Sequence, residues 1–383
     1  MNILVLGAGM MGRAIAYDLG MFSRFKKIIV GDKDRKILAS AGAFLKGKRI
    51  EITTINVDNG SDVKKQFQNS DVVISAVPYR FNYELAKTAV ETGTHFVDLG
   101  GNNVIVEKER SLTQKAKKND VTVIPDSGLA PGLVSIITRD IVDHMDTVDS
   151  VKLRVGGLPR YPKPPLNYQI VFSPYGLINE YVEDAIVLDH GKILEKKSMT
   201  DLEALEFPKP FGSMEAFVTS GGCSTLPYTY KEKIQYLDYK TIRYPGHCEK
   251  IKTLLELGFA EQTPMTIGGQ SVVPREMLVS LLIKHLPTTG EDAVLLKVLS
   301  QGTKNRKRYL REYMMIDYYD AKHDITSMMR TTGYPVSITA QMIENGTIQE
   351  RGVFCPEEIV PPQPFFRELE KRDIHIQIID RSV

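Results

Sequence analysis

The chain has 383 residues, 42% of them hydrophobic and 25% charged, and a formal net charge of +2. This is the composition of an ordinary globular protein; the length favours two domains, and the small net charge gives no indication of a nucleic-acid partner. No apolar run could span a bilayer, and Met1 leads directly into an expected strand, so we expect a cytoplasmic protein without a signal peptide or a membrane partner. Its three cysteines, odd in number and scattered, argue against a disulfide framework and a cysteine zinc site.

The first part of the chain carries a dinucleotide-binding pattern. An apolar run over 2–6 precedes glycines in G-x-G-x-x-G spacing, a helical pattern follows over 13–19, and a second apolar run ends at Asp32. The glycines permit a tight turn, close approach of a pyrophosphate and close packing of the helix, whose N-terminus then holds the phosphates. The residues of this turn expected to bind the cofactor are Gly7, Gly9, Met10, Met11 and Gly12.

Asp32 indicates which dinucleotide binds. An acid at the end of the second strand accepts hydrogen bonds from both hydroxyls of the adenosine ribose, whereas a 2′-phosphate there would meet like charge. The sequence therefore predicts NAD, with NADP less favoured.

Apolar runs alternate with helical patterns as far as Pro125. Six strands alternating with helices predict an α/β domain built on a doubly wound parallel (Rossmann) sheet, with ligands at the carboxyl ends of its strands. Four strands follow the first two, over 50–58, 71–78, 95–99 and 121–125, with helices over 35–45, 61–67, 82–92 and 106–118. The further residues expected to lie at the cofactor are Asp58, Ala76, Val77, Pro78, Gly128 and Leu129.

The pattern changes after Pro125. A turn-rich hinge over 127–132 and a helix over 133–145 lead into strand-like runs joined by long connections rich in Pro and Gly, which indicates a second α+β domain built on a largely antiparallel sheet. These runs lie over 150–156, 167–172, 185–189, 214–219 and 236–244; a helix interrupted near 333–335 is expected over 326–341, and a late strand over 374–379. We expect a dinucleotide-binding domain over 1–125, completed by 345–383, and a substrate-binding and dimerisation domain over 126–344.

Several short motifs together resemble the saccharopine dehydrogenase-like family. Besides the glycine turn they are Val77-Pro78-Tyr79, Asp98-Leu99-Gly100-Gly101-Asn102, Gly128-Leu129-Ala130-Pro131-Gly132, Gly156-Gly157-Leu158-Pro159 and Arg243-Tyr244-Pro245-Gly246-His247. Saccharopine reductases of this family usually carry an acid where this chain has Ala130, and a cysteine where it has Val155. The chain is therefore more similar to the L-lysine 6-dehydrogenase branch, which implies NAD-dependent oxidation of the ε-amine of lysine to a semialdehyde that cyclises to a piperideine carboxylate, with release of ammonia.

This chemistry requires a general base and a cationic clamp. The ε-ammonium must lose a proton before hydride can leave its carbon, and a substrate carboxylate is best held by Arg. We expect Asp126 to be the base, with Asp98 as its rival and Tyr79 as a supporting donor. The resemblance makes Arg243 the clamp, and Tyr168 and His247 are expected to line the substrate site. No cluster has metal-ligand spacing, so no metal is expected.

Two other interpretations remain open. One keeps the fold but makes the substrate saccharopine or carboxynorspermidine, and the other is a non-catalytic regulator that senses a dinucleotide. The antiparallel sheet could pair across a two-fold axis, so we expect a homodimer.

Overall fold

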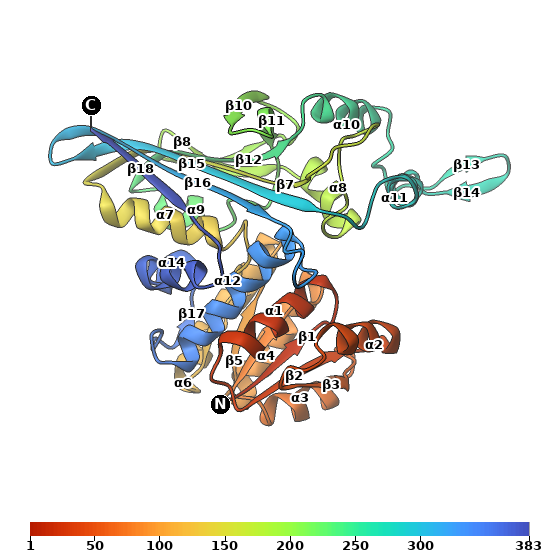
Figure 1. Ribbon diagram of the computed structural model, residues 1–383, viewed down its shortest axis with the longest axis vertical. Helices are drawn as coiled ribbons and strands as arrows, with labels where there is room; N and C mark the ends of the chain where they lie inside the picture. The colour runs from red at the N-terminus through yellow and green to blue at the C-terminus, as the bar shows by residue number, and fades with distance from the viewer. Residues whose placement is uncertain (383) are drawn as a thin grey trace. The chain divides into compact units, whose positions relative to one another are not determined.

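The computed structural model describes residues 1–382, which form two compact units, each described below by itself (Figure 1). Unit 1 comprises Met1–Asp143, Ser224–Leu226 and Met329–Ile374, and unit 2 comprises His144–Cys223, Pro227–Met328 and the chain from His375 onward. The division differs from the expected domains over 1–125 with 345–383 and over 126–344. The helix after the hinge and most of the long helix near the C-terminus belong to unit 1, whereas the last residues form a strand in the sheet of unit 2.

Unit 1 is built on a seven-stranded parallel sheet with the order β17-β6-β5-β4-β1-β2-β3 (Figure 1). The strands that follow β1 along the chain, β2 and β3, lie on one side of it, and β4, β5 and β6 lie on the other side. Sheets with such a reversal of strand order bind ligands at the carboxyl end of the strand where the order reverses, which here is β1. The expected Rossmann sheet is confirmed, and the short seventh strand comes from the C-terminal part of the chain. The strands are β1 (Asn2–Leu6), β2 (Lys27–Asp32), β3 (Ile50–Thr54), β4 (Val72–Ser75), β5 (His95–Asp98), β6 (Thr122–Ile124) and β17 (Gly352–Val353).

The helices of unit 1 follow the expected pattern with one break. The helix expected over 106–118 is two helices, because the hydroxyls of Ser111 and Thr113 donate hydrogen bonds to the carbonyls of Lys108 and Arg110, at 2.5 and 2.6 Å, and so compete with the helical ladder. The helices are α1 (Met10–Phe22), α2 (Arg35–Phe44), α3 (Gly60–Gln68), η1 (Tyr79–Phe81), α4 (Asn82–Thr92), α5 (Asn103–Arg110), α6 (Thr113–Lys118), α7 (Leu133–His144), α12 (Ser327–Glu344), α13 (Pro356–Ile359) and α14 (Pro362–Glu370).

Helix α12 runs through the point where an interruption is expected. It is continuous from Ser327 to Glu344 with Pro335 inside it. A Cβ on Gly333 would lie 3.0 Å from the Cβ of Ala14, so the glycine lets α12 pack closely against α1. Burial of this helix outweighs the low intrinsic propensity of Gly and Pro.

A buried ion pair fixes α1 within unit 1. Asp18 of α1 accepts hydrogen bonds from Arg372 at 2.6 and 3.0 Å, and both side chains are fully buried. Ser337 and Gln341 of α12 donate to the same carboxylate, at 2.7 and 3.1 Å. Because every partner of Asp18 lies in unit 1, the helix that begins at the glycine turn is held in one orientation.

Unit 2 is built on a nine-stranded sheet with the order β10-β11-β12-β7-β15-β16-β18, to which the hairpin β8–β9 is added beside β12 (Figure 1). All of its pairings are antiparallel except β12 with β7, so the expected largely antiparallel sheet is confirmed. The strands are β7 (Thr147–Pro159), β8 (Ala185–Asp189), β9 (Lys192–Lys196), β10 (Glu203–Phe207), β11 (Gly212–Val218), β12 (Ile234–Arg243), β15 (Asp292–Lys304), β16 (Lys307–Tyr318) and β18 (Gln377–Ser382).

The strand expected over 167–172 does not form. Tyr168 and Ile170 are buried in a hydrophobic cluster with α8, α10 and α11, and the segment joins no sheet. Its alternating apolar residues therefore reflect packing against helices. The remaining elements are α8 (Pro174–Val182), α9 (Leu226–Tyr230), α10 (His247–Glu256), α11 (Pro274–His285) and the hairpin β13 (Met265–Ile267) with β14 (Gln270–Val272).

Candidate active site

The glycine turn of unit 1 has the geometry of a phosphate cradle. A Cβ on Gly12 would lie 1.7 Å from the carbonyl oxygen of Gly7, so α1 can begin this close to β1 only with glycine at position 12. Gly9 is the N-cap of α1; no side chain caps the helix, and a Cβ built on Gly9 has no atom within 4 Å. The first amides of α1 therefore face a site that a phosphate can occupy, and the turn fits a dinucleotide.

Asp32 closes one side of this turn. Its Oδ2 accepts a hydrogen bond from the backbone N–H of Ala8 at 2.8 Å, and its Oδ1 accepts one from the N–H of Asp34 at 2.9 Å. Asp58 is exposed, and its carboxylate lies 3.6 Å from Nζ of Lys33. Asp32 thus ends the strand next to β1, whereas β3 ends at Thr54 and Asp58 lies in the loop that follows it, not in the strand expected over 50–58.

The remaining expected cofactor residues also belong to unit 1. Gly7 lies against Ala76 and Val77: a Cβ at this glycine would be 2.7 Å from the Ala76 carbonyl oxygen and 3.4 Å from a methyl of Val77. Pro78 is exposed and is the N-cap of η1. Gly128 and Leu129 are buried in the hinge.

Three buried carboxyl groups lie beyond the carboxyl ends of β5 and β6. Asp98 ends β5, Glu109 projects from α5, and Asp126 follows β6; at most 1% of each is exposed. The N–H groups of Gly100 and Asp126 donate to Oδ1 of Asp98, at 2.6 and 3.3 Å. Oδ2 of Asp98 and both carboxyl oxygens of Glu109 are buried without a hydrogen-bond partner among the described residues. The charge of Asp98 acts on Glu109, so ionisation of both buried groups is unfavourable and one of them stays protonated.

Asp126 is held in an uncommon backbone conformation. Its φ is 58°, in the left-handed region that residues other than glycine rarely adopt. Ser224 donates a hydrogen bond to its Oδ2, while its Oδ1 is buried without a hydrogen-bond partner among the described residues. A Cβ on Gly100 would lie 1.7 Å from that Oδ1, so the expected Asp98–Asn102 turn needs glycine to admit the carboxylate. Tyr79 lies against the same turn, 3.4 Å from a Cβ built on Gly101.

Burial controls the ionisation of this group of acids. Removal from water raises the pKa of Asp126 to about 7; the hydrogen bond from Ser224 opposes the shift, and the nearby charge of Asp98 adds to it. Burial also raises the pKa of Glu109, and the charge of Asp98 raises it further, so Glu109 keeps the proton of the pair. Asp126 can therefore exchange a proton near neutral pH.

Unit 2 contains a buried arginine within a chain of hydrogen bonds. Arg243, at the end of β12, donates from Nε to the Tyr181 hydroxyl at 3.0 Å and from Nη1 to the carbonyl of Ile242 at 2.9 Å. The Tyr181 hydroxyl lies 3.0 Å from Nε2 of His247, whose Nδ1 lies 3.0 Å from the carbonyl oxygen of Leu166. Because a carbonyl only accepts, Nδ1 carries the proton and Nε2 accepts from Tyr181.

This chain of hydrogen bonds leaves one edge of Arg243 available. Nη2 has no hydrogen-bond partner among the described residues, and the guanidinium carbon lies 4.9 Å from the ring centre of Tyr168. Burial, and then the charge of Arg243, lowers the pKa of His247 to about 3, so His247 is neutral. Both of its ring nitrogens are engaged, and it could influence a ligand only through Tyr181, not by the direct contact expected from the sequence.

The sequence predicts several residues that lie together within each unit, but it does not predict three residues that contact or surround them. Ser224 lies in the turn-rich stretch 219–225, where its polar composition gives the only signal. Glu109 follows the buried Val106 by three residues, which places an acid on the apolar face of a helix and is a signal that could have been noticed. No pattern in the sequence indicates Tyr181. Among residues 1–382, no group of His, Cys, Asp and Glu could hold a metal ion, and no helix is long and apolar enough to cross a membrane.

The parallel sheet and its glycine turn define a dinucleotide-binding fold of the Rossmann class. Comparison with known proteins agrees: the saccharopine dehydrogenase NADP binding domain matches residues 3–124, and the saccharopine dehydrogenase C-terminal domain matches residues 128–374. The chain therefore belongs to the saccharopine dehydrogenase family.

Its relatives are distant. Saccharopine dehydrogenase (NADP(+), L-glutamate-forming) of Saccharomyces cerevisiae is 23% identical, with 97% of each chain covered. Mitochondrial alpha-aminoadipic semialdehyde synthase of Rattus norvegicus is 22% identical over 94% of this chain, which spans only 46% of the synthase. The solved apo structure of the S. cerevisiae L-Glu-forming saccharopine dehydrogenase matches with a TM-score of 0.81 at 22% identity, covering 100% of this chain and 99% of that one.

The open space at Gly9 gives a testable prediction for the cofactor site. Gly9→Ala should fold normally, because φ is −67° and nothing lies near the added methyl, but it should weaken dinucleotide binding about tenfold or more by occupying the phosphate position. Calorimetric titration with NADH and NADPH measures this. Gly12→Ala is the matched control, which should lower the melting temperature because its methyl meets the Gly7 carbonyl. Wild-type affinity in Gly9→Ala would contradict the assignment.

Proposed function

We propose that the protein is an NAD-dependent L-lysine 6-dehydrogenase. The observation that carries the proposal is Asp126: a buried carboxylate beyond a Rossmann strand, with a pKa near neutrality and one oxygen without a partner. Such a group can take the proton of an ammonium, which amine oxidation requires before hydride can leave the adjacent carbon. The relatives' names place them in lysine-related chemistry, in keeping with an amino-acid substrate.

The charges in unit 2 favour a substrate with one carboxylate. Arg243 is buried and has a free Nη2, as a carboxylate clamp requires. The other buried cations of unit 2 pair with protein groups: Arg154 and Lys240 with Glu203, Arg311 with Asp380, and Arg275 with Asn179. Lysine carries one carboxylate, whereas saccharopine carries three and would call for more free cations.

The proposed reaction balances as follows. Asp126 accepts the proton of the ε-ammonium at its free Oδ1. A nicotinamide held at the glycine turn would supply the acceptor for the hydride that leaves the ε-carbon. Water then adds to the carbon of the substrate imine and ammonia leaves as ammonium, so that one lysine, one NAD⁺ and one water give the semialdehyde, ammonium, NADH and one proton. Within the protein, the hydroxyl of Ser224 orients the carboxylate of Asp126 by a hydrogen bond. The carboxylate of Asp98 accepts a hydrogen bond from the N–H of Asp126 and so holds the backbone of Asp126 in place.

A saccharopine or carboxynorspermidine dehydrogenase is the second candidate, favoured by the names of the relatives. An NAD(P) reduction assay with L-lysine, ornithine, saccharopine and carboxynorspermidine separates the two. Turnover with lysine alone supports the proposal, and turnover with saccharopine alone would reject it. Dinucleotide binding without turnover of any amine would support the third interpretation, a non-catalytic sensor.

The pKa of Asp126 predicts the pH dependence of the reaction. Because the base must be ionised and its pKa is raised to about 7, kcat/KM for lysine should rise with pH and level off above an apparent pKa of about 7. Asp126→Asn should lower kcat by about 10²-fold or more and remove this limb. Steady-state rates from pH 5 to 9 measure it, with Asp120→Asn, an exposed acid of the same unit, as the control. An unchanged limb in Asp126→Asn would exclude Asp126 as the base.

Asp32 supports NAD, although the matching family model and the S. cerevisiae relative are named for NADP. The wild type should have a higher kcat/KM with NAD. Replacing Asp32 by Ser together with Lys33→Arg should shift the preference toward NADP, because the change removes a negative charge and supplies a partner for the 2′-phosphate. The ratio of kcat/KM values for the two cofactors measures the shift. A wild type that already prefers NADP would contradict the role given to Asp32.

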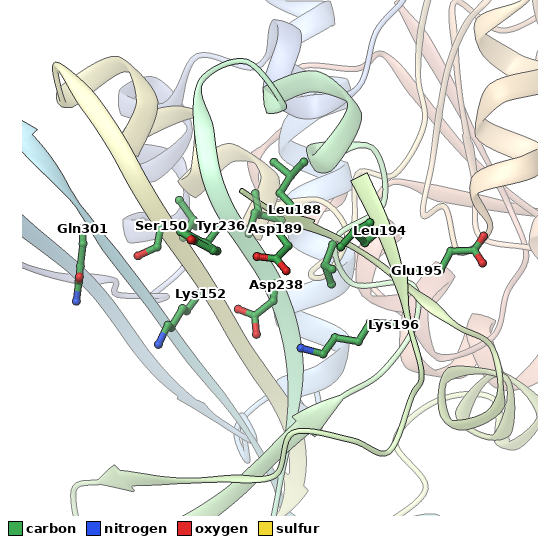
Figure 2. Close-up of a pocket in the computed structure, with 13 residues that line it drawn as sticks. Ser150, Lys152, Leu188, Asp189, Leu194, Glu195, Lys196, Tyr236, Asp238 and Gln301 are labelled. Atoms are coloured by element: carbon green, nitrogen blue, oxygen red, sulfur yellow. The ribbon is translucent and has the colours of Figure 1, made fainter. Parts of the chain in front are cut away.

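A homodimer remains part of the proposal. One face of the unit 2 sheet is hollowed by a pocket of about 510 Å³, where Lys152, Lys196, Asp189 and Asp238 lie around Leu194 and Tyr236 (Figure 2). Both signs of charge and exposed apolar side chains occur together, so a second copy related by a two-fold axis could satisfy them. Light scattering at micromolar concentration should give about twice the 43.0 kDa of the chain. A monomer would reject this part.

A further inference from the structure

Ser224, which donates a hydrogen bond to Asp126, lies in a short segment of unit 1. Ser224–Leu226 belong to this unit, although the residues on both sides of them belong to unit 2. Ser224 donates to Oδ2 of Asp126, and the hydroxyl of Thr225 donates to Oε1 of Glu357 at 2.7 Å. At most 4% of each of these four residues is exposed. Two adjacent buried hydrogen bonds therefore fix the segment within unit 1.

The two acids that accept these hydrogen bonds follow neighbouring parallel strands. Strand β17 pairs with β6, with Val353 opposite Val123. Asp126 lies in the chain just after β6, and Glu357 lies in α13, which follows β17. Because paired parallel strands run in the same direction, both acids lie beyond the carboxyl edge of the sheet. The strand pairing thus sets the spacing of the two acceptors.

Glu358, next to Glu357 in the chain, holds α13 in place. Its carboxylate accepts hydrogen bonds from Arg110 at 2.7 and 3.1 Å and from the N–H of Cys355 at 2.7 Å. These contacts fix the start of the helix and pair the charge of Arg110. The two consecutive acids of α13 therefore have separate tasks, and Glu357 is the one that contacts Thr225.

Both residues joined by the Ser224–Asp126 hydrogen bond have an uncommon backbone conformation. The φ angle is 44° at Ser224 and 58° at Asp126, in the left-handed region. Residues other than glycine keep such a conformation only where surrounding contacts hold them in it. At Asp126 this contact is the hydrogen bond from its N–H to Asp98, and at Ser224 the adjacent contact is that of Thr225 with Glu357.

The charges that act on Asp126 come from acids. Asp98 at the end of β5, Glu109 on α5 and Glu357 on α13 all interact electrostatically with it. Burial is the main cause that raises the pKa of Asp126 to about 7, and the charges of Asp98 and Glu357 contribute. The buried thiol of Cys355, the N-cap of α13, is neutral because burial raises its pKa.

We propose that Thr225 and Glu357 are positioning residues for the base. Glu357 fixes the hydroxyl of Thr225, and the backbone held in this way presents the hydroxyl of Ser224 to Oδ2 of Asp126. Oδ1 of Asp126, which has no hydrogen-bond partner among the described residues, is thereby kept for the proton of the substrate. The inference rests on the function proposed above, because it concerns the base of that reaction.

The two positioning residues should act on Asp126 with opposite signs. A hydrogen bond to a carboxylate favours the ionised form, so losing the Thr225 contact, and with it the bond from Ser224, should raise the pKa of Asp126. The negative charge of Glu357 disfavours the same form, so removing that charge should lower the pKa. A role in stability alone would not give two shifts of opposite sign.

The test measures the pKa of Asp126 directly, on the full chain. Carbon-13 NMR of protein labelled at the aspartate carboxyl carbon follows the titration, and the signal of Asp126 is the one missing from Asp126→Asn. The pH dependence of kcat/KM for lysine is recorded for the same variants. These are Thr225→Val, which has the same shape without a hydroxyl, Thr225→Ser, which keeps the hydroxyl, and Glu357→Gln, which keeps an acceptor without a charge. Glu370→Gln, at an exposed acid of unit 1, is the control.

Thr225→Val should raise the pKa of Asp126 by about one unit and lower kcat about 10-fold, with KM within about twofold of wild type. Thr225→Ser should recover most of both losses. Glu357→Gln should lower the pKa by about half a unit and move the limb of the pH profile to lower pH by the same amount. Glu370→Gln should match the wild type. Melting curves check that each variant is folded.

An unchanged pKa of Asp126 in Thr225→Val would overturn the inference, as would equal effects of Thr225→Val and Thr225→Ser, or a raised pKa in Glu357→Gln. The expected shifts in a protein that oxidises no lysine would reject the proposed function alone. Lysine oxidation by a protein in which Thr225→Val leaves Asp126 unaffected would reject the inference and leave the proposed function standing.

Discussion

The structure depends on one close approach, between the first turn of α1 and the turn that leaves β1. Only glycine at position 12 allows the helix to begin against the carbonyl of Gly7, because any Cβ would lie 1.7 Å from that oxygen. The ion pair of Asp18 with Arg372, buried among α12 side chains, then holds the same helix from its other end. A helix fixed at both ends keeps its uncapped N-terminus in place as an anion site.

Both units bury ionisable groups, and the surroundings of these groups differ between the two units. In unit 1 three acids share few donors, so Glu109 remains protonated and Asp126 titrates near neutrality. In unit 2 the positive charge of Arg243 is buried with aromatic rings and a neutral histidine. Incompletely paired buried charge is costly in a folded protein, which makes these positions candidates for ligand chemistry.

Membership of the saccharopine dehydrogenase family gives the reaction class, and individual residues suggest where this chain departs from its named relatives. The hinge has Ala130 and no acid at that position, Asp32 puts a carboxylate beside the glycine turn, and the buried Arg243 has an Nη2 without a hydrogen-bond partner among the described residues. Each of these features concerns the charge at one expected binding position. A single residue at such a position can change which ligand is preferred while the fold stays the same.

The sequence by itself determined the Rossmann sheet, the glycine turn, the stop of α4 at Gly93 and the largely antiparallel character of the second sheet, because these follow from local spacing and alternation. It did not determine the unit boundaries, the continuous α12 or the irregular course of 167–172, because packing between segments distant in sequence overrides local propensity there. Only the tertiary structure placed Ser224 on Asp126 and Tyr181 between Arg243 and His247. Those partners are separated along the chain by tens of residues, and no periodicity records a contact made only by folding.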